Sequence, residues 1–143
     1  MRFLIVDGHS VIFAWPELRA RHGRSTDAAR GELVQRLTTY QDASGVRVVV
    51  VFDGKGAKPG DETEPGGIQI FYSKTGQTAD DIVKRLVARY AKEHEITVAS
   101  DDLMERQTAL TFGAMTMSTS MLRDTLADAD RDLARRLRDH RRR

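Results

Sequence analysis

Four short apolar runs, separated by stretches of helical spacing, limit the folds open to this chain more than any other feature. The runs lie at residues 2 to 6, 46 to 52, 68 to 72 and 95 to 99, and the second is rich in β-branched side chains. A run that is apolar at almost every position is typical of a strand buried on both faces of a parallel sheet. Alternation of such strands with helices predicts an α/β fold, a three-layer α/β/α sandwich around a mostly parallel central sheet.

One helix is predicted between the first two strands. We expect a turn after the first strand, a break at Trp15 and Pro16, and then a helix that begins near Asp27. Ser44 and Gly45 would end this helix, because Ser is a weak helix former and Gly readily adopts the conformation of a helix C-terminus.

Three further helices are predicted after the second strand. One follows residues 75 to 78, a short one lies around 102 to 111, and the last begins near residue 118, after a brief extended piece at 114 to 117. Residues 54 to 67 contain five Gly and two Pro and should form a surface loop. The last helix carries one apolar stripe, formed by Leu122, Leu126, Leu133 and Leu137.

The composition fits one soluble domain with a basic end. A length of 143 residues is typical of a single domain, here 1 to 143, with a basic C-terminal helix at about 118 to 143. The chain has no Cys, no apolar run long enough to span a bilayer and no signal-peptide pattern, so we expect a cytoplasmic protein. Residues 131 to 143 contain seven Arg and two Asp and therefore carry a net charge of +5. Because the whole chain has a net charge of +2, residues 1 to 130 carry −3.

Acidic residues occur where the predicted strands end or the predicted helices begin. Asp7, Asp53 and Asp101 come at the ends of three strands, and Asp80 and Asp81 come at the beginning of a helix. Because the carboxyl ends of parallel strands meet at one edge of a sheet, we expect these side chains to share a pocket. Carboxylates without Cys or His ligands favour Mg²⁺ or Mn²⁺ over zinc.

Several of these acids also have a purely structural interpretation. Asp7 and Asp53 are residues of a kind that stabilises turns, although two such acids ending neighbouring strands favour the metal site. Thr78 and Asp81 form a capping-box pattern, which explains Asp81 without a metal. Ser100 is a candidate N-cap with Asp101 beside it, and Asp102 leaves the same choice between cap and ligand open.

Basic side chains near the predicted acidic edge are candidates for binding a polyanion. Lys55, Lys58 and Lys74 lie on predicted loops, and Arg138 and Arg141 lie at the basic end of the last helix. Aromatic residues make up only 6% of the chain, so no stacking platform for single-stranded RNA stands out.

Seven short motifs together resemble the YacP-like branch of the NYN-domain ribonucleases. They are VDGHS at 6 to 10, AWPEL at 14 to 18, YQ at 40 and 41, VVVVFDG at 48 to 54, QTADD at 77 to 81, ASD at 99 to 101 and FGA at 112 to 114. NYN domains resemble the PIN nucleases, so the resemblance implies a parallel-sheet α/β fold and an acidic Mg²⁺ or Mn²⁺ site for cutting RNA. The family's first motif usually reads VDGYN, so that His9 and Ser10 here replace Tyr and Asn.

The resemblance also implies roles for individual residues. The catalytic acids would be Asp7, Asp53, Asp80 and Asp101, of which Asp7, Asp80 and Asp101 hold the principal ion while Asp53 and Asp81 assist. Ser10, Ser100 and Asp102 would support them.

The implied activity is that of a metal-dependent endoribonuclease. Its partners would be RNA and a larger assembly such as the ribosome, and we expect a monomer. Two alternatives stay open on the sequence, namely an RNA-binding domain of weak activity and a metal-dependent phosphohydrolase that acts on a small molecule.

Overall fold

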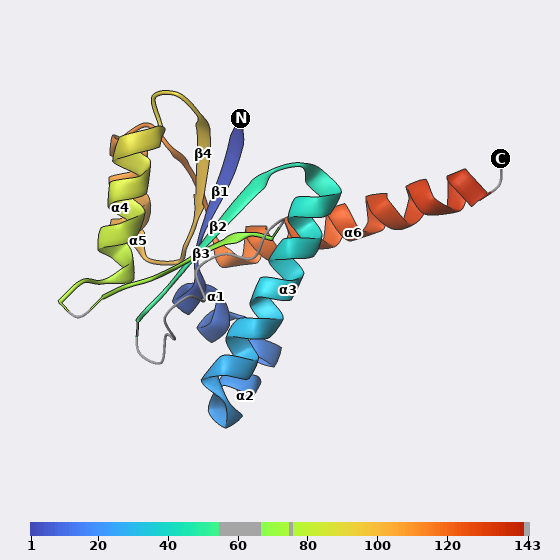
Figure 1. Ribbon diagram of the computed structural model, residues 1–143, viewed down its shortest axis with the longest axis horizontal. Helices are drawn as coiled ribbons and strands as arrows, with labels where there is room; N and C mark the ends of the chain where they lie inside the picture. Colours follow the sequence, from blue (N-terminus) through green and yellow to red (C-terminus); the bar gives the residue numbers. More distant parts are fainter. Residues whose placement is uncertain (55–66, 75, 142–143) are drawn as a thin grey trace.

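Five parallel strands form one sheet in the order β3-β2-β1-β4-β5 (Figure 1). This computed structural model describes residues 1–54, 67–74 and 76–141. The strands are β1 (Arg2–Asp7), β2 (Arg47–Phe52), β3 (Gln69–Tyr72), β4 (Glu95–Ala99) and β5 (Met115–Met117). The helices are α1 (Gly8–Ala14), α2 (Pro16–Arg24), α3 (Thr26–Ser44), α4 (Ala79–Tyr90), α5 (Leu103–Thr111) and α6 (Thr119–Arg141).

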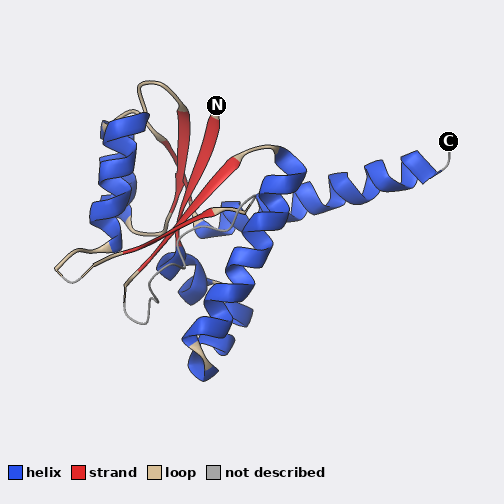
Figure 2. Ribbon diagram, viewed as in Figure 1, coloured by secondary structure: helices blue, strands red, loops and turns tan. Residues whose placement is uncertain are grey.

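The sheet lies between two layers of helices, which confirms the predicted three-layer sandwich (Figure 2). Alternate residues of the central strands face opposite sides, so Leu4 and Val6 pack in one core cluster and Ile5 packs in the other. The first cluster includes side chains of α1, α2, α3 and α6, and the second includes side chains of α4 and α5. Burial on both faces explains why the strands are apolar at nearly every position.

The predicted turn after the first strand is wrong, because α1 and α2 occupy that segment. Asp7 is the N-cap of α1, and its side chain accepts a hydrogen bond from the backbone N–H of Ser10. Pro16 stands at the beginning of α2, where its missing N–H costs nothing. The Pro therefore starts a helix rather than breaking one, and Trp15 is the junction between α1 and α2.

Trp15 also attaches the beginning of α6 to the rest of the domain. Its side chain is 3% exposed, and its indole N–H donates to the carbonyl of Thr119 at 3.1 Å. Glu17 pairs with Arg36 of α3 at 3.0 Å and with Arg123 of α6 at 2.6 Å. Three helices are thus held together close to the point where α6 begins.

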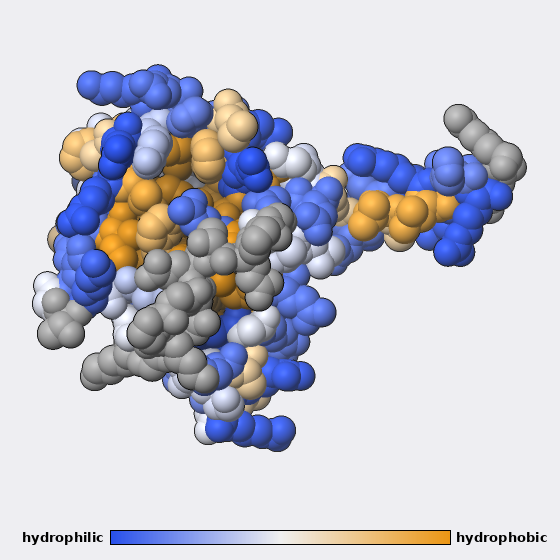
Figure 3. Space-filling model, viewed as in Figure 1, coloured by the Kyte–Doolittle hydropathy of each residue, from blue (hydrophilic) through white to orange (hydrophobic). Residues whose placement is uncertain are grey.

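The far half of α6 projects beyond the body of the domain (Figures 1 and 3). Leu122 and Leu126 are buried, whereas Leu137, on the same predicted stripe, is 53% exposed. The stripe predicted from the sequence therefore packs against the core only in its first part. In the described part of the chain, no helix is long and apolar enough to cross a membrane. The loop predicted at 54 to 67 lies mostly outside the described residues.

Candidate active site

The carboxylate of Asp7, at the end of β1, is held by two serine residues. Its side chain is 7% exposed. Ser10 donates to it from its hydroxyl at 3.0 Å and from its backbone N–H at 3.4 Å, and the hydroxyl of Ser100 donates at 3.2 Å. Val6 pairs with Ala99, so the residues that follow β1 and β4 meet at one edge of the sheet. These contacts fix the orientation of the Asp7 carboxylate.

The glycines that follow Asp7 and Asp53 permit close approaches near this edge. A Cβ atom on Gly8 would lie 2.4 Å from the ring of Phe52. A Cβ atom on Gly54 would lie 1.5 Å from the carbonyl oxygen of Ser73. The Asp-Gly pairs of the sequence thus have a packing reason, because no side chain fits at either glycine.

Asp80 and Glu105 add two carboxyl groups to the one on Asp7. Asp80 lies in the first turn of α4, and Glu105 lies in the first turn of α5, where it is 2% exposed and within hydrogen-bonding reach of Asp80. Oδ2 of Asp80 pairs with Lys84 at 3.2 Å. Oδ1 of Asp80 and Oε1 of Glu105 are buried, and neither has a hydrogen-bond donor among the described residues. Two ionised carboxylates offer each other no donor, so this pair needs a shared proton or a cation.

The surroundings of Glu105 favour its protonated form. Burial away from water is the largest cause, followed by the negative charges of Asp7, Asp80 and Asp102, and together with the contact to Asp80 they raise the pKa of Glu105 to about 9. A buried carboxyl group among like charges keeps its proton, whereas a nearby cation would favour ionisation. The electrostatics thus show that three acids of the site act on one buried carboxyl group.

Sequence reasoning missed Glu105. It follows the N-cap Asp102 by three residues, a position at which Glu commonly serves the helix end. The position of Glu105 four residues before Ala109 is the signal that could have revealed its burial. Residues four apart lie on the same face of a helix, and Glu105 and Ala109 are the buried residues of α5.

Asp101 and Asp102 both stabilise helix N-termini. Asp101 accepts hydrogen bonds from the backbone N–H of Thr119 at 2.9 Å and from its hydroxyl at 2.7 Å. Asp102 is the N-cap of α5 and accepts from two backbone N–H groups of that helix. The N-cap predicted at Ser100 is therefore wrong, because Ser100 instead accepts from the N–H of Asp102 at 3.0 Å and donates to Asp7.

Asp81 adopts the capping role that the sequence left open. Its carboxylate accepts from the backbone N–H of Thr78 at 3.1 Å, and its own N–H donates to the Thr78 hydroxyl at 3.2 Å. The hydrogen bond from the Thr78 backbone is the main cause that lowers the pKa of Asp81. The capping box is thus complete at the beginning of α4.

Asp53 lies apart from the acids that act on Glu105. It follows β2, its side chain is exposed, and its backbone carbonyl accepts from Arg30 at 2.8 Å. Asp53 instead lines a small hollow together with His9 and Phe13. The structure therefore brings Asp7 and Asp80 near an unpredicted Glu105, while Asp53 lines the hollow beside His9 and Phe13.

The predicted RNA-binding residues occupy separate places. Lys74 is exposed after β3. Arg138 and Arg141 lie at the far end of the projecting α6, remote from the acidic edge (Figure 1). Lys55 and Lys58 lie outside the described residues.

The oxygen-rich site fits a hard divalent cation in its donor chemistry. Asp7, Asp80 and Glu105 offer carboxylate oxygens only, the ligands that Mg²⁺ and Mn²⁺ prefer. Asp80 and Glu105 each have one buried oxygen without a hydrogen-bond donor among the described residues, and these two oxygens are the ones that a bound cation would contact. Within the described ranges, no group of three His, Asp or Glu side chains is placed so that it could hold a metal ion.

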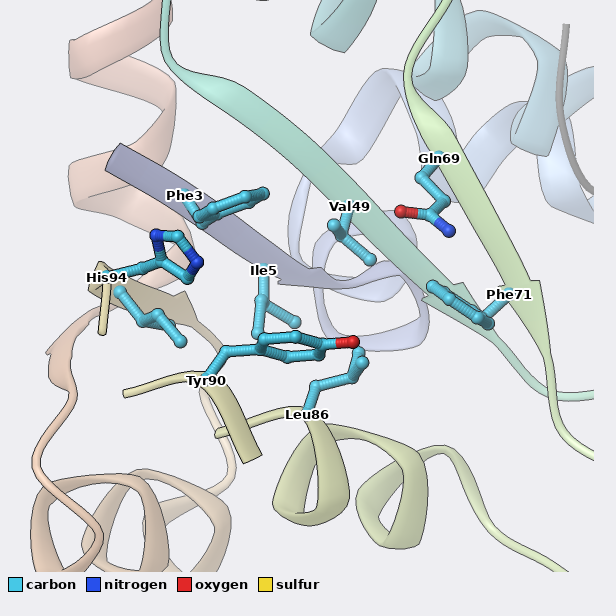
Figure 4. A pocket seen from close by; sticks show the side chains of 9 residues that line it. Phe3, Ile5, Val49, Gln69, Phe71, Leu86, Tyr90 and His94 are labelled. Atoms are coloured by element: carbon cyan, nitrogen blue, oxygen red, sulfur yellow. The ribbon is translucent and has the colours of Figure 1, made fainter. Parts of the chain in front are cut away.

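A larger hollow of about 230 Å³ lies on the sheet face beside α4 (Figures 3 and 4). Its wall is mostly apolar and includes Phe3, Phe71 and Leu86, with Gln69, Tyr90 and His94 as the polar members. Phe3 and Gln69 lie near the beginnings of their strands, away from the carboxyl ends where the acids gather. This hollow is therefore distinct from the acidic site.

Acids gathered at the carboxyl edge of a parallel α/β sheet define a PIN-like domain. The model of the YacP-like NYN domain matches residues 4–143, and the chain belongs to that family. The NYN domains are part of the PIN-like nuclease superfamily, which supports a nuclease or RNA-related role.

Similar proteins are found in Bacillus subtilis, the first of them in strain 168. The protein described as "Uncharacterized protein YacP" is 31% identical over 140 residues, which cover 96% of this chain and 82% of that protein. The crystal structure of Rae1 (YacP) from Bacillus subtilis superposes with a TM-score of 0.82 at 32% identity, covering 97% of this chain and 81% of the other. The crystal structure of its W164L mutant gives a TM-score of 0.81 at 30% identity, with coverages of 96% and 81%.

Proposed function

We propose that this chain is a metal-dependent endoribonuclease whose reaction centre is formed by Asp7, Asp80 and Glu105. The observation that carries the proposal is that Asp80 and Glu105 lie within hydrogen-bonding reach of each other and that each has one buried carboxyl oxygen without a donor among the described residues. Leaving such groups unsatisfied is costly, and a site that keeps them in this state is typical of function rather than of stability. The family supports the nuclease part of the proposal.

In this proposal, Asp7, Asp80 and Glu105 hold Mg²⁺ or Mn²⁺, with Asp101 close to the same edge. A divalent cation bound there supplies a more acidic water and offsets the charge that develops on the phosphate. Ser10 and Ser100 keep the Asp7 carboxylate pointing at the site through hydrogen bonds of 3.0 and 3.2 Å. Glu105 would hold the cation in its ionised form, because a nearby positive charge favours the carboxylate that burial and the neighbouring acids disfavour.

Ser10 acts as a positioning residue in this account. It occupies the place of Asn in the family's usual first motif, and its hydroxyl donates to Asp7 while also accepting from the N–H of Asp101 at 3.4 Å. The shorter side chain thus connects two of the acids by hydrogen bonds. The replacement of the amide is therefore compatible with an ordered site.

RNA is the proposed substrate, bound mainly through its phosphates. The acidic body would repel a polyanion except where a cation neutralises it, so basic side chains must provide the rest of the affinity. Arg138 and Arg141 are exposed at the end of a helix that projects from the body (Figure 1). This helix is suited to contact a distant part of a long or structured RNA, such as RNA bound to a ribosome.

The test is cleavage of single-stranded and structured RNA with Mn²⁺, with Mg²⁺ and with EDTA. We expect cutting with either ion, none with EDTA, and a loss of at least a hundredfold in Asp7→Asn, because that change removes one carboxylate charge at constant size. Thr38→Ala, at a half-buried site on α3, is the control and should cut normally. RNA binding without cutting under every metal would reject the enzyme and favour an RNA-binding domain.

A further inference from the structure

Three rings lie in a row of tilted contacts next to the end of β1, with interplanar angles of 41° and 58°. His9 and Phe13 are four residues apart on α1, and their ring centroids are 4.4 Å apart. His22, from α2, continues the row at 4.8 Å from Phe13. The low aromatic content of the chain concealed this arrangement, because two of the three rings are histidines from different helices.

Phe13 leaves much of its ring open to water. It is 41% exposed, whereas the neighbouring Ile12 and Trp15 are each 3% exposed. A partly exposed aromatic ring is accessible for stacking with a nucleobase. The two histidines contact this ring and enlarge the aromatic surface around it.

A small hollow adjoins this row of rings and carries polar groups. His9, Phe13 and His22 line it together with Arg30 and Asp53. Its volume is about 30 Å³, too small to admit a nucleobase, so a base would lie across the rings rather than inside. Asp53 can accept a hydrogen bond from an exocyclic amine of such a base, as carboxylates do at base edges.

The positively charged side chain of Arg30 lines the hollow. The guanidinium of Arg30 lies 5.1 Å from the ring centroid of Phe52 and 5.8 Å from that of Tyr72. It also donates to the carbonyl of Asp53 at 2.8 Å. These contacts hold the positive charge of Arg30 at the hollow, where it can attract a phosphate group.

The row of rings is close to the acids in the chain and in space. His9 is two residues after Asp7, and the next residue, Ser10, donates to the Asp7 carboxylate at 3.0 Å. Helix α1 begins directly after β1, so it carries both Ser10, which contacts Asp7, and the two rings of His9 and Phe13.

We propose that His9, Phe13 and His22 form a stacking subsite for one unpaired nucleobase beside the scissile phosphate. This inference rests on the proposed function, since it assigns a substrate contact to the same site. Stacking requires a free base face, so the subsite selects single-stranded over paired RNA. It gives the present family member a specificity element that lies outside the acidic cluster.

The experiment measures binding to a short RNA that contains 2-aminopurine, a fluorescent base that stacking quenches. All variants carry Asp7→Asn to prevent cutting. We expect Phe13→Ala to lose the quenching and about tenfold in affinity, and Phe13→Tyr, which keeps the ring, to retain both. Phe112→Ala is the matched control, because Phe112 is 49% exposed at the opposite end of α5 from Glu105.

The inference is overturned if the protein with Phe13→Ala quenches 2-aminopurine and binds the RNA as well as the protein with Asp7→Asn alone. It is also overturned if Phe112→Ala weakens binding as much as Phe13→Ala does. If Phe13→Ala does not fold, His22→Ala on α2 replaces it, with the same expected loss and the same contrary result. A duplex of the same sequence should show no quenching that depends on Phe13, and equal quenching of the duplex would also overturn it.

The same variants separate this inference from the proposed nuclease. If the protein without Asp7→Asn cuts RNA with Mn²⁺ but Phe13→Ala leaves KM and kcat unchanged, the subsite is wrong and the nuclease stands. If no RNA is cut under any metal while quenching depends on Phe13, the subsite stands and the nuclease is wrong.

Discussion

The carboxyl groups of Asp80 and Glu105 come within hydrogen-bonding reach although they belong to different helices, and one buried oxygen of each lacks a donor among the described residues. Asp80 also pairs with Lys84, which offsets part of its charge, whereas Glu105 is almost fully buried. The pair resembles two acids that share one proton. We take this relationship as the structural core of the site.

The raised pKa of Glu105 makes the metal-free protein less stable as the pH rises. Its pKa is about 9 in the folded chain against an ordinary 4.5, so the folded state holds a proton that the unfolded state releases between these values. Stability attributable to this group is complete below pH 4.5 and is lost progressively up to about pH 9. Thermal unfolding in EDTA across this range should show the decline.

Glu105→Gln should remove most of that pH dependence. The amide cannot ionise, so we expect the variant to be more stable than the parent at pH 8, on the order of 2 kcal/mol, and equally stable at pH 5. Glu93→Gln, at an exposed position, is the control and should follow the parent at every pH. Identical pH profiles for parent and Glu105→Gln would contradict the assigned environment of Glu105.

Glu17 should show the opposite dependence on pH. Burial opposes its ionisation, but hydrogen bonds from its own backbone N–H, Arg36 and Arg123 outweigh burial and lower the pKa of Glu17 to about 2. Its contribution is present above pH 4.5 and is lost as the pH falls toward 2. We expect Glu17→Gln to cost about 1 kcal/mol at pH 7, since the side chain is partly exposed and screened by solvent.

The measurement for Glu17 is urea unfolding at pH 7 and pH 3. The difference between Glu17→Gln and the parent should shrink at the lower pH. A difference that stays constant would show that Glu17 acts through packing rather than through charge.

Ser10→Ala should lower activity without unfolding the protein. The change removes the hydroxyl that donates to Asp7 at 3.0 Å, so the carboxylate loses part of its orientation. Loss of such a supporting contact typically costs 10- to 100-fold in metal affinity or activity, and about that loss is expected in kcat/KM. Ser25→Ala, at the N-cap of α3, is the control, and a normal rate for Ser10→Ala would remove Ser10 from the site.

Asp80→Asn and Asp81→Asn should differ although the residues are adjacent. Asp80 meets Glu105, so its substitution should abolish cutting and leave the fold intact. Asp81 closes the capping box with Thr78, so its substitution should lower the melting temperature and leave most of the activity. Equal losses of activity in both variants would instead place Asp81 at the reaction centre.

The sheet and part of the site were predictable because they depend on local patterns. Apolar runs marked β1, β2, β3 and β4, and residues that end a parallel strand must lie at the carboxyl edge, as Asp7 does. Asp80 was predictable from the helix start that follows β3.

The remaining features depend on tertiary contacts that no local pattern reveals. Glu105 looks like a residue of a helix end, and only the packing of α5 against the sheet buries it beside Asp80. Asp53 has the sequence context of Asp7, but its backbone contact with Arg30 and its position beside His9 and Phe13 depend on helices that the sequence did not reveal. The helices α1 and α2 were missed because Pro16 appears as a break until its position in the first turn is known.

The most direct test of the account is calorimetric titration of the purified protein with Mn²⁺ at pH 7. We expect saturable binding in the parent, a loss of at least tenfold in affinity in Glu105→Gln and Asp80→Asn, and no change in Glu93→Gln, the surface control. Parent and variants should unfold cooperatively, so that lost binding reports the site rather than the fold. Absence of Mn²⁺ binding to the parent, or equal binding in all four proteins, would contradict a cation site at Asp80 and Glu105.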